Sequence, residues 1–210
     1  MVNDQKIVKG TGLFNGSLNI AAWQTNITTL GPGTRAVVWV QGCPFHCHGC
    51  IAPDWIPQSP AIQIPPEDLA QELLSHENFT GITLSGGEPM LQAEGLRILL
   101  EYIQAERKVD VICFTGFRME VIRGNPAMTA ARRLLNQIDV LIDGAYMQDR
   151  NDDRGLRGSS NQRIHHLTDR LRDFDFINAP RSVELTFQEN ELWIAGIPPR
   201  AFSKVLPTIG

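Results

Sequence analysis

The sequence predicts an α/β fold built on a parallel sheet. Between residues 36 and 143, short apolar runs rich in β-branched residues alternate with segments of helical periodicity. Strands that alternate with helices favour parallel pairing, either as an open α/β fold or as a complete or partial barrel. The residue pattern by itself leaves these arrangements open.

Length and composition indicate one ordinary globular domain. The 210 residues suffice for one large core, and 42% hydrophobic with 20% charged residues argues against a disordered or collagen-like chain. A formal net charge of −4 gives no overall attraction to nucleic acid or anionic lipid, so neither is expected as a partner. Without a signal-peptide pattern or a bilayer-spanning apolar run, the protein is expected to be cytoplasmic and not membrane-bound.

Three segments are expected along the chain. Residues 1–17 are polar and glycine-rich, and we expect a mobile N-terminal arm. Residues 18–180 are expected to form the main domain. Residues 181–210 are expected to add a β-hairpin and a tail packed on the same domain.

Five strands are expected in the main domain. Residues 18–23 could form an edge strand, and the Gly31-Pro32-Gly33 turn separates them from the next strand. The buried strands are expected at the apolar, β-branched runs of residues 36–40, 81–85, 109–115 and 138–143.

Helical segments are expected between these strands. Pro65, Pro66 and the acidic pair that follows them indicate a helix start, because proline suits the first turn and acids favour the positive end of the helix dipole. Apolar residues from Leu91 to Ile103 predict a long helix, and residues 130–137 belong to another helical segment.

Polar and alternating patterns mark the last third of the chain. Residues 144–158 are polar and predict an exposed loop, and exposed loops often carry function. Further on, residues 182–188 and 191–197 flank Glu189-Asn190, and apolar residues alternate with polar ones in the first of them. This pattern predicts a β-hairpin.

Three of the four cysteines, Cys43, Cys47 and Cys50, lie within eight residues of the loop that follows the strand at residues 36–40. They cannot form disulfides with three separate partners when only Cys113 is left, so reduced thiols that bind a metal are expected. Sulfur ligands select zinc, copper(I) or iron–sulfur clusters, and the CxxxCxxC spacing lets one loop wrap a polynuclear cluster. Three cysteines would leave one iron of a 4Fe-4S cluster open for a substrate or cofactor.

The remaining thiol and the histidines of the loop have alternative roles. A zinc site with three cysteines and either His46 or His48 is the alternative to a cluster. Otherwise, both histidines are expected to face solvent. Cys113 lies in an apolar strand, where a free cysteine usually packs as a small hydrophobic residue.

A second motif, Gly86-Gly87-Glu88-Pro89, follows the strand at residues 81–85. Glycines let the backbone approach a ligand closely, and amides at the following helix start can bind an anionic group such as a carboxylate. An ordinary tight turn is the alternative. Because the two motifs follow successive parallel strands, both should lie at the carboxyl edge of the sheet, where ligand sites occur.

The two motifs together carry a family resemblance. CxxxCxxC followed about forty residues later by SGGEP resembles the radical S-adenosylmethionine (SAM) superfamily, in which three cysteines hold a 4Fe-4S cluster and SAM chelates the fourth iron. The segments GPGTR, WVQGC, FTGF, DVLIDG and RGSSNQRI narrow this resemblance to anaerobic ribonucleotide reductase activating proteins, over roughly residues 31–165.

The resemblance implies a partial (βα) barrel of the radical SAM type, here with a C-terminal β-hairpin extension. It implies that the three cysteines are the cluster ligands and act in catalysis. It further implies that the SAM pocket includes Gly86, Gly87, Glu88, Pro89, Thr115, Gly116, Asp143, Ser160 and Asn161. Asp143 could instead accept a turn amide, and Ser160 and Asn161 could instead cap a helix or turn.

The implied reaction is reductive cleavage of SAM to a 5'-deoxyadenosyl radical, which generates a glycyl radical on a partner such as anaerobic ribonucleotide reductase. A flavodoxin or ferredoxin would supply the electron. The chain departs from the family at Ile51 and Ala52, where an aromatic residue and an asparagine are frequent, and it continues about 45 residues past RGSSNQRI. The alternatives are a radical SAM enzyme acting on a peptide or small molecule, as 7-carboxy-7-deazaguanine synthase does, and a non-catalytic zinc or iron–sulfur module.

Overall fold

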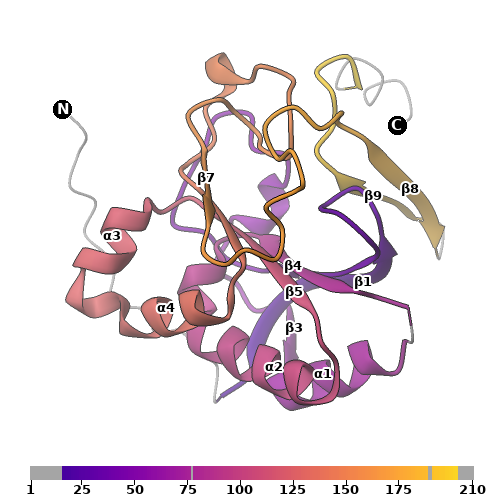
Figure 1. The fold of residues 1–210 in the computed structure, drawn as a ribbon, viewed down its shortest axis with the longest axis vertical. Coiled ribbons are helices and arrows are strands. Elements are labelled where there is room, and N and C mark those ends of the chain that lie inside the picture. Colours follow the sequence, from indigo (N-terminus) through magenta and orange to yellow (C-terminus); the bar gives the residue numbers. More distant parts are fainter. Residues whose placement is uncertain (1–15, 77, 189–190, 203–210) are drawn as a thin grey trace.

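The computed structural model describes residues 16–76, 78–188 and 191–202. Within them, a seven-stranded sheet has the order β3-β1-β2-β4-β5-β6-β7, and β8 and β9 form a separate two-stranded sheet (Figure 1). The predicted α/β class is confirmed, with a mixed sheet. In this described part of the chain, no helix combines the length and apolar character needed to cross a membrane.

Parallel strands form the centre of the seven-stranded sheet. They are β2 (Arg35–Val40), β4 (Gly81–Gly86), β5 (Asp110–Thr115) and β6 (Val140–Asp143). Each matches a predicted strand to within two residues. Most of their side chains are buried, which explains why the strands read as continuous apolar runs.

Antiparallel strands flank this centre. β1 (Leu18–Ile27) pairs with β2 and with the three-residue β3 (Ile62–Ile64), so the expectation that residues 18–23 form an edge strand is wrong. On the other side, β7 (Arg163–His166) pairs antiparallel with β6. Sequence patterns missed β3 because it is short and largely exposed, and missed β7 because three of its four residues are basic or imidazole side chains.

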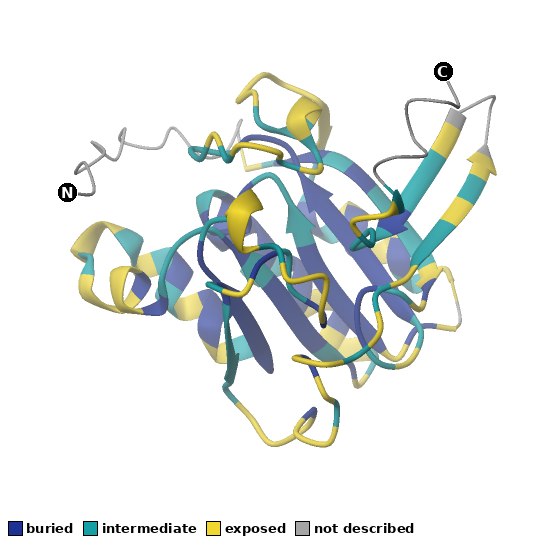
Figure 2. Cartoon of the chain, turned by 90° about the horizontal axis from the view of Figure 1, so that it is seen from above, coloured by how far each residue is buried: buried dark blue, intermediate teal, exposed yellow. Residues whose placement is uncertain are grey.

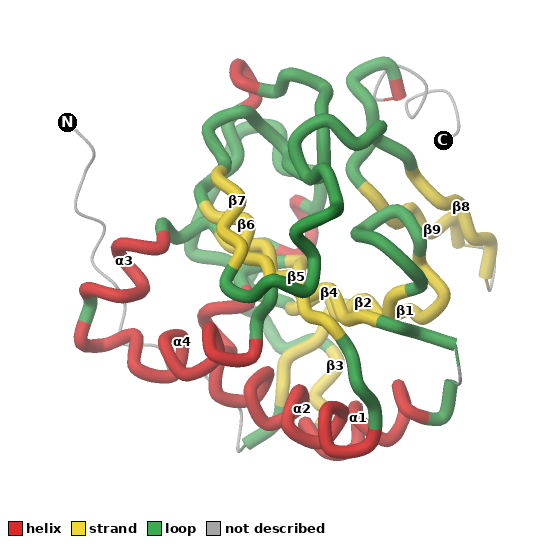
Figure 3. Tube along the Cα trace, viewed as in Figure 1, coloured by secondary structure: helices red, strands yellow, loops and turns green. Residues whose placement is uncertain are grey.

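Helices cover one face of the sheet. α1 (Pro66–Leu74) begins at the predicted proline, and α2 (Ala93–Glu106) follows a short 3-10 turn at Pro89–Gln92. α3 (Met119–Gly124) and α4 (Thr129–Leu134) connect β5 to β6. Figure 3 shows α1, α2 and α4 along the same side of the strands. Their apolar residues join one core cluster that includes Val38, Ile82, Leu73, Leu99 and Leu134.

Loops and the C-terminal segment cover the other face. Figure 2 shows the central strands buried beneath partly exposed connecting segments. The second core cluster joins sheet residues with residues from the chain after β6, including Trp39, Ile112, Ile142, Leu156, Phe176 and Ala195. The described part of the chain beyond residue 165 is therefore packed on the same body through Leu171, Phe176 and Ala195.

The predicted hairpin is confirmed as β8 (Val183–Gln188) paired antiparallel with β9 (Glu191–Gly196). It contacts the segment between β1 and β2, where a Glu184 carboxylate oxygen accepts a hydrogen bond from the Thr28 amide at 2.9 Å and Thr29 Oγ1 donates to the Ala195 carbonyl at 3.0 Å. The expected turn at residues 189–190, residues 1–15 of the N-terminal arm and residues 203–210 of the tail lie outside the described residues.

Candidate metal and cofactor centre

The cysteine loop starts where β2 ends. Cys43, Cys47 and Cys50 are free and partly buried. The base of the loop is closed by two backbone hydrogen bonds, from the Gly42 amide to the Trp55 carbonyl and from the Cys43 amide to the Ile56 carbonyl, both 2.9 Å. These bonds hold a thiol-rich loop at the carboxyl edge of the sheet.

Two buried glutamines support the base of this loop. The Gln41 side-chain amide donates to the carbonyls of Asp54 (3.2 Å) and Pro57 (2.7 Å). The Gln92 side-chain amide donates to the Gln41 carbonyl at 3.0 Å and to the Asn19 carbonyl at 2.8 Å. Sequence reasoning missed both glutamines, because only their distant partners reveal the role.

The glycine motif lies directly against the cysteine loop. The Gly87 amide donates to the Val40 carbonyl at 2.7 Å, and the Glu88 amide donates to the Gly42 carbonyl at 2.8 Å. Gly86 has φ +97°, and a Cβ there would lie 2.5 Å from the Val40 nitrogen. A Cβ at Gly87 would overlap the Gly42 carbonyl. Both glycines are needed because backbone packs on backbone, and they bring the two motifs together.

Glu88 connects the glycine motif to the end of β5. Its buried carboxylate accepts hydrogen bonds from the Met90 amide (2.9 Å), Thr115 Oγ1 (2.7 Å) and the Gly116 amide (2.7 Å). Burial raises the pKa of Glu88 to about 7, and these hydrogen bonds oppose the rise. Glu88, Thr115 and Gly116 therefore form one hydrogen-bonded group at adjacent strand ends, next to buried Pro89.

An aromatic pair covers this group. A Cβ at Gly116 would overlap the ring of Phe45, which comes from the cysteine loop. The Phe45 and Phe117 rings meet edge-to-face with centroids 4.9 Å apart. Phe45 was missed from sequence, although the glycine of FTGF is the small residue that makes room for it.

Asp143 occupies the end of β6, with its side chain fully buried. The carboxylate accepts hydrogen bonds from the Met119 amide at the start of α3 (2.7 Å) and from Arg163 Nη2 (2.6 Å), and His165 Nε2 lies 3.0 Å away. Burial raises its pKa, but these hydrogen bonds and the adjacent positive charge outweigh burial and hold the pKa at about 2. The alternative role for Asp143, accepting a backbone amide, is thus present.

The Ser160-Asn161 segment is folded around Gln162. The side-chain oxygen Oε1 of Gln162 accepts a hydrogen bond from the Gly158 amide at 2.7 Å, and its Nε2 donates to the Gly144 carbonyl at 2.8 Å. Asn161 donates to the Ala145 carbonyl at 2.8 Å, while its buried Oδ1 has no hydrogen-bond partner among the described residues. Ser160 is exposed, and its backbone amide donates to a carbonyl of the preceding loop.

The loop after β6 borders the cysteines. Burial raises the pKa of the Cys47 thiol, and the nearby backbone of Tyr146 opposes this rise. Gly49 has φ +71°, and a Cβ there would lie 3.0 Å from the Gln148 side chain. His46 and His48 are exposed, as expected. Tyr146 and Gln148 were missed from sequence, and the small Gly49 was the available signal.

The three thiols influence one another electrostatically. Burial raises the pKa of Cys43 to about 12, and the nearby Glu88, Cys47 and Cys50 raise it further, while a hydrogen bond with the Phe45 backbone opposes them. The Cys43 thiol therefore ionises readily only beside positive charge, which bound iron would supply.

The donor set fits a 4Fe-4S cluster. In the described residues, no three or more His, Cys, Asp or Glu side chains are arranged to hold a single metal ion. A cubane cluster instead takes each thiolate at a different iron. The remaining Cys113 is fully buried in β5 within the apolar core, as predicted.

Comparisons with known proteins agree with these features. Residues 29–165 match the family described as "4Fe-4S single cluster domain". The anaerobic ribonucleoside-triphosphate reductase-activating protein of Salmonella typhi is 34% identical over 147 residues, which cover 65% of this chain and 91% of that protein. The protein of the same name from Escherichia coli K12 is 32% identical over 148 residues, which cover 65% of this chain and 91% of that protein. The one from Enterobacteria phage T4 is 32% identical over 146 residues, which cover 66% of this chain and 88% of that protein. The chain therefore belongs to the family of anaerobic ribonucleoside-triphosphate reductase-activating proteins, with a 4Fe-4S single cluster domain.

Proposed function

We propose that this protein is a radical SAM enzyme that generates a glycyl radical on anaerobic ribonucleotide reductase. The observation that carries the proposal is the direct packing of the glycine motif against the three-cysteine loop, in a chain related to activating proteins. A loop whose metal only stabilised the fold would not need the glycine motif packed against it.

In this proposal Cys43, Cys47 and Cys50 hold a 4Fe-4S cluster. When bound and reduced, the cluster and SAM supply a 5'-deoxyadenosyl radical that removes a hydrogen atom from a glycine of the partner. The fourth cysteine, Cys113, is buried in the core, so it leaves one iron open for SAM.

The chain's own groups would orient SAM. Gly86, Gly87, Glu88 and Pro89 would face its methionine part with backbone groups, because the Glu88 carboxylate already accepts three hydrogen bonds within the protein.

The neighbouring strand end and the loop after β6 would complete the SAM pocket. Thr115 and Gly116 extend the surface to β5. Asn161 Oδ1 is buried and has no hydrogen-bond partner within the described part of the chain. Because most buried polar atoms in proteins form a hydrogen bond, this oxygen would accept one from a donor such as the SAM amino group. Asp143 and Ser160 would shape this side of the pocket, Asp143 by holding Arg163 and the start of α3.

The remaining parts of the proposal concern the whole chain. The mixed sheet would be the partial (βα) barrel of radical SAM enzymes within residues 18–180, preceded by a mobile arm at 1–17 and followed by the hairpin and tail at 181–210. A flavodoxin or ferredoxin would reduce the cluster. The reduced cysteines suit a cytoplasmic location, and no nucleic acid or membrane partner is proposed.

The alternatives have less support. A radical SAM enzyme acting on a peptide or small molecule would use the same centre, and the hairpin, which lies outside the matched residues 29–165, is the feature that favours it. The relatedness to activating proteins weighs against it. A non-catalytic zinc or iron–sulfur module is disfavoured by the relatedness to activating proteins, and zinc is disfavoured also by the 4Fe-4S family match.

The test is anaerobic reconstitution with iron and sulfide, reduction, addition of SAM and chromatographic detection of 5'-deoxyadenosine. We expect a brown protein that releases this product. A colourless protein that retains one zinc and cleaves no SAM would contradict the proposal. With anaerobic ribonucleotide reductase added, an EPR glycyl signal is expected, whereas its absence alongside a modified peptide or small molecule would favour the other enzyme.

A further inference from the structure

The chain after β7 contacts the loop at residues 144–158. We call the described residues 167–188 and 191–202 the C-terminal extension. Within the loop, Gly155 has φ +65°, and a Cβ there would overlap the Phe176 carbonyl of the extension. The Leu156 amide donates to the same carbonyl at 2.8 Å. The loop predicted to be exposed is exposed at residues 147–150 and 152–154, but Gly155 and Leu156 are buried against the extension.

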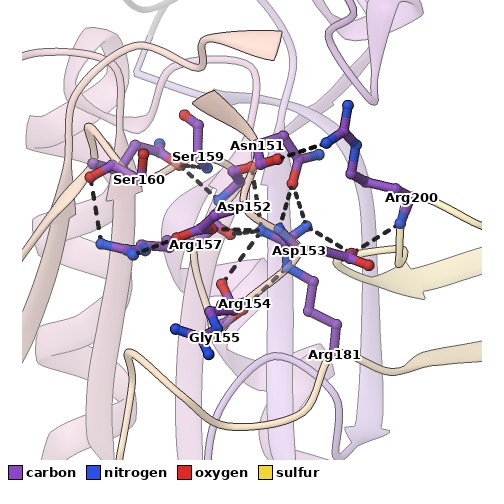
Figure 4. Close-up of polar contacts among 12 residues, drawn as sticks. Asn151, Asp152, Asp153, Arg154, Gly155, Arg157, Ser159, Ser160, Arg181 and Arg200 are labelled. Carbon is purple, nitrogen blue, oxygen red and sulfur yellow. Dashed lines mark hydrogen bonds and ion pairs between the residues drawn. The ribbon is translucent and has the colours of Figure 1, made fainter. Parts of the chain in front are cut away.

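Arg181 is the main polar contact between these two segments (Figure 4). Its side chain is only 2% exposed. Nη2 donates to the carbonyls of Arg157 (2.5 Å) and Gly158 (3.2 Å), and Nη1 donates to Asn151 Oδ1 (2.8 Å) and lies 3.4 Å from Asp153 Oδ1. A planar guanidinium satisfies several acceptors at once, so it fixes the path of the loop around it.

The same contacts continue to the cysteine loop. Asn151, which accepts from Arg181, donates through Nδ2 to the Tyr146 hydroxyl at 3.3 Å. The backbone of Tyr146 lies close enough to the Cys47 thiol to lower its pKa. The Gln148 side chain lies against Gly49. A continuous set of contacts therefore joins the buried arginine to the cysteine loop.

We propose that Arg181 is a positioning residue that holds the 144–158 loop against the cysteine loop, so that the C-terminal extension limits solvent access to the cluster. The contacts with the loop are independent of any cofactor. The shielding of the cluster rests on the proposed function.

Limited trypsin digestion tests the positioning without a cluster. Arg150 and Arg154 are exposed cleavage sites on the loop, and fragments ending at each can be quantified by mass spectrometry. In Arg181→Gln, cleavage at both should be about tenfold faster than in the wild type, because local opening exposes the loop to the protease. Arg172→Gln is the matched control, because Arg172 lies on the same extension and is mostly exposed. Among the described residues its side chain pairs with Asp169, three residues earlier in the same turn.

A second variant keeps the test decisive if Arg181→Gln does not fold. Asn151→Ala keeps the arginine but removes the acceptor for Arg181 Nη1 and the donor to Tyr146. Because residue 151 directly follows the Arg150 cleavage site, the readout for this variant is cleavage after Arg154, which should be faster than in Arg172→Gln. Rates in both variants equal to that of the control would overturn the proposal.

The cluster readout uses reconstituted protein exposed to a fixed low oxygen concentration, with decay of the iron–sulfur absorbance followed in time. Decay should be several-fold faster in Arg181→Gln than in the control, and Arg181→Lys should restore part of the protection because it keeps the charge and some donors. Equal rates of absorbance decay in Arg181→Gln, Arg181→Lys and the Arg172→Gln control would overturn the proposed shielding of the cluster. If the wild type itself takes up no 4Fe-4S cluster, the proposed function fails, and the trypsin result still decides the positioning.

Discussion

Replacing Gly87 with alanine should separate the glycine motif from the cysteine loop. A Cβ there would overlap the Gly42 carbonyl and lie 2.8 Å from its carbon and 2.9 Å from the Trp55 oxygen. These atoms belong to backbone held by hydrogen bonds, so neither side can yield cheaply. Overpacking costs roughly 1–3 kcal/mol, and weakening the two hydrogen bonds to Val40 and Gly42 costs roughly 1 kcal/mol each.

The free energy of unfolding of Gly87→Ala should therefore fall by about 3–5 kcal/mol. Urea denaturation of the cluster-free, reduced protein, followed by circular dichroism, measures this difference. Gly124→Ala is the matched control, because Gly124 is exposed in α3 and a Cβ there meets nothing within 4 Å. Since alanine favours a helix over glycine, the control should gain about 0.5 kcal/mol. Equal stability of the two variants would refute the close-packing argument.

Three further predictions concern the ligands and two buried charges. After reconstitution, the iron–sulfur absorbance should be lost in Cys50→Ala and kept in Cys113→Ala. Loss of this absorbance in Cys113→Ala would show that the core cysteine is a ligand. The pKa of Asp143 is about 2 in the folded protein and 3.8 in the unfolded chain. Its ionised form therefore adds about 2 kcal/mol to the free energy of unfolding above pH 4, and this stabilisation is lost as the pH falls toward 2. Asp143→Asn should therefore be less stable at pH 7, and acid titration of unfolding should show its deficit shrinking below pH 4; a constant deficit would contradict the pairing. Arg35→Met should cost about 3–5 kcal/mol in urea unfolding, because it removes a fully buried guanidinium that pairs with partly buried Asp110 at 2.7 Å and donates to the Ile82 carbonyl at 2.7 Å. A change under about 1 kcal/mol would argue against the pair.

Local pattern was enough for the central strands and the ligand loop. Buried parallel strands must be apolar along their whole length, so β2, β4, β5 and β6 were visible as runs of apolar residues. Thiolate ligands contributed by one short loop must be close in sequence, so the cysteine spacing was also visible. The family followed from several such short motifs taken together.

Local pattern failed where an element depends on its neighbours. β3 has only three residues and exists because it pairs with β1, which moves residues 18–23 away from the sheet edge. β7 is polar and exists because it pairs with β6. Neither strand buries enough apolar surface of its own to leave a periodic signal.

The sequence by itself determined the positions of the central strands along the chain, the three-cysteine loop and the family, because each depends on residues close together in the chain. Only the tertiary structure decided that Gly87 packs on Gly42, that Glu88 is buried against Thr115 and that Arg181 holds the loop beside Cys47. Each of these contacts joins residues far apart in sequence, and its strength comes from burial and partners that exist only once the sheet is assembled.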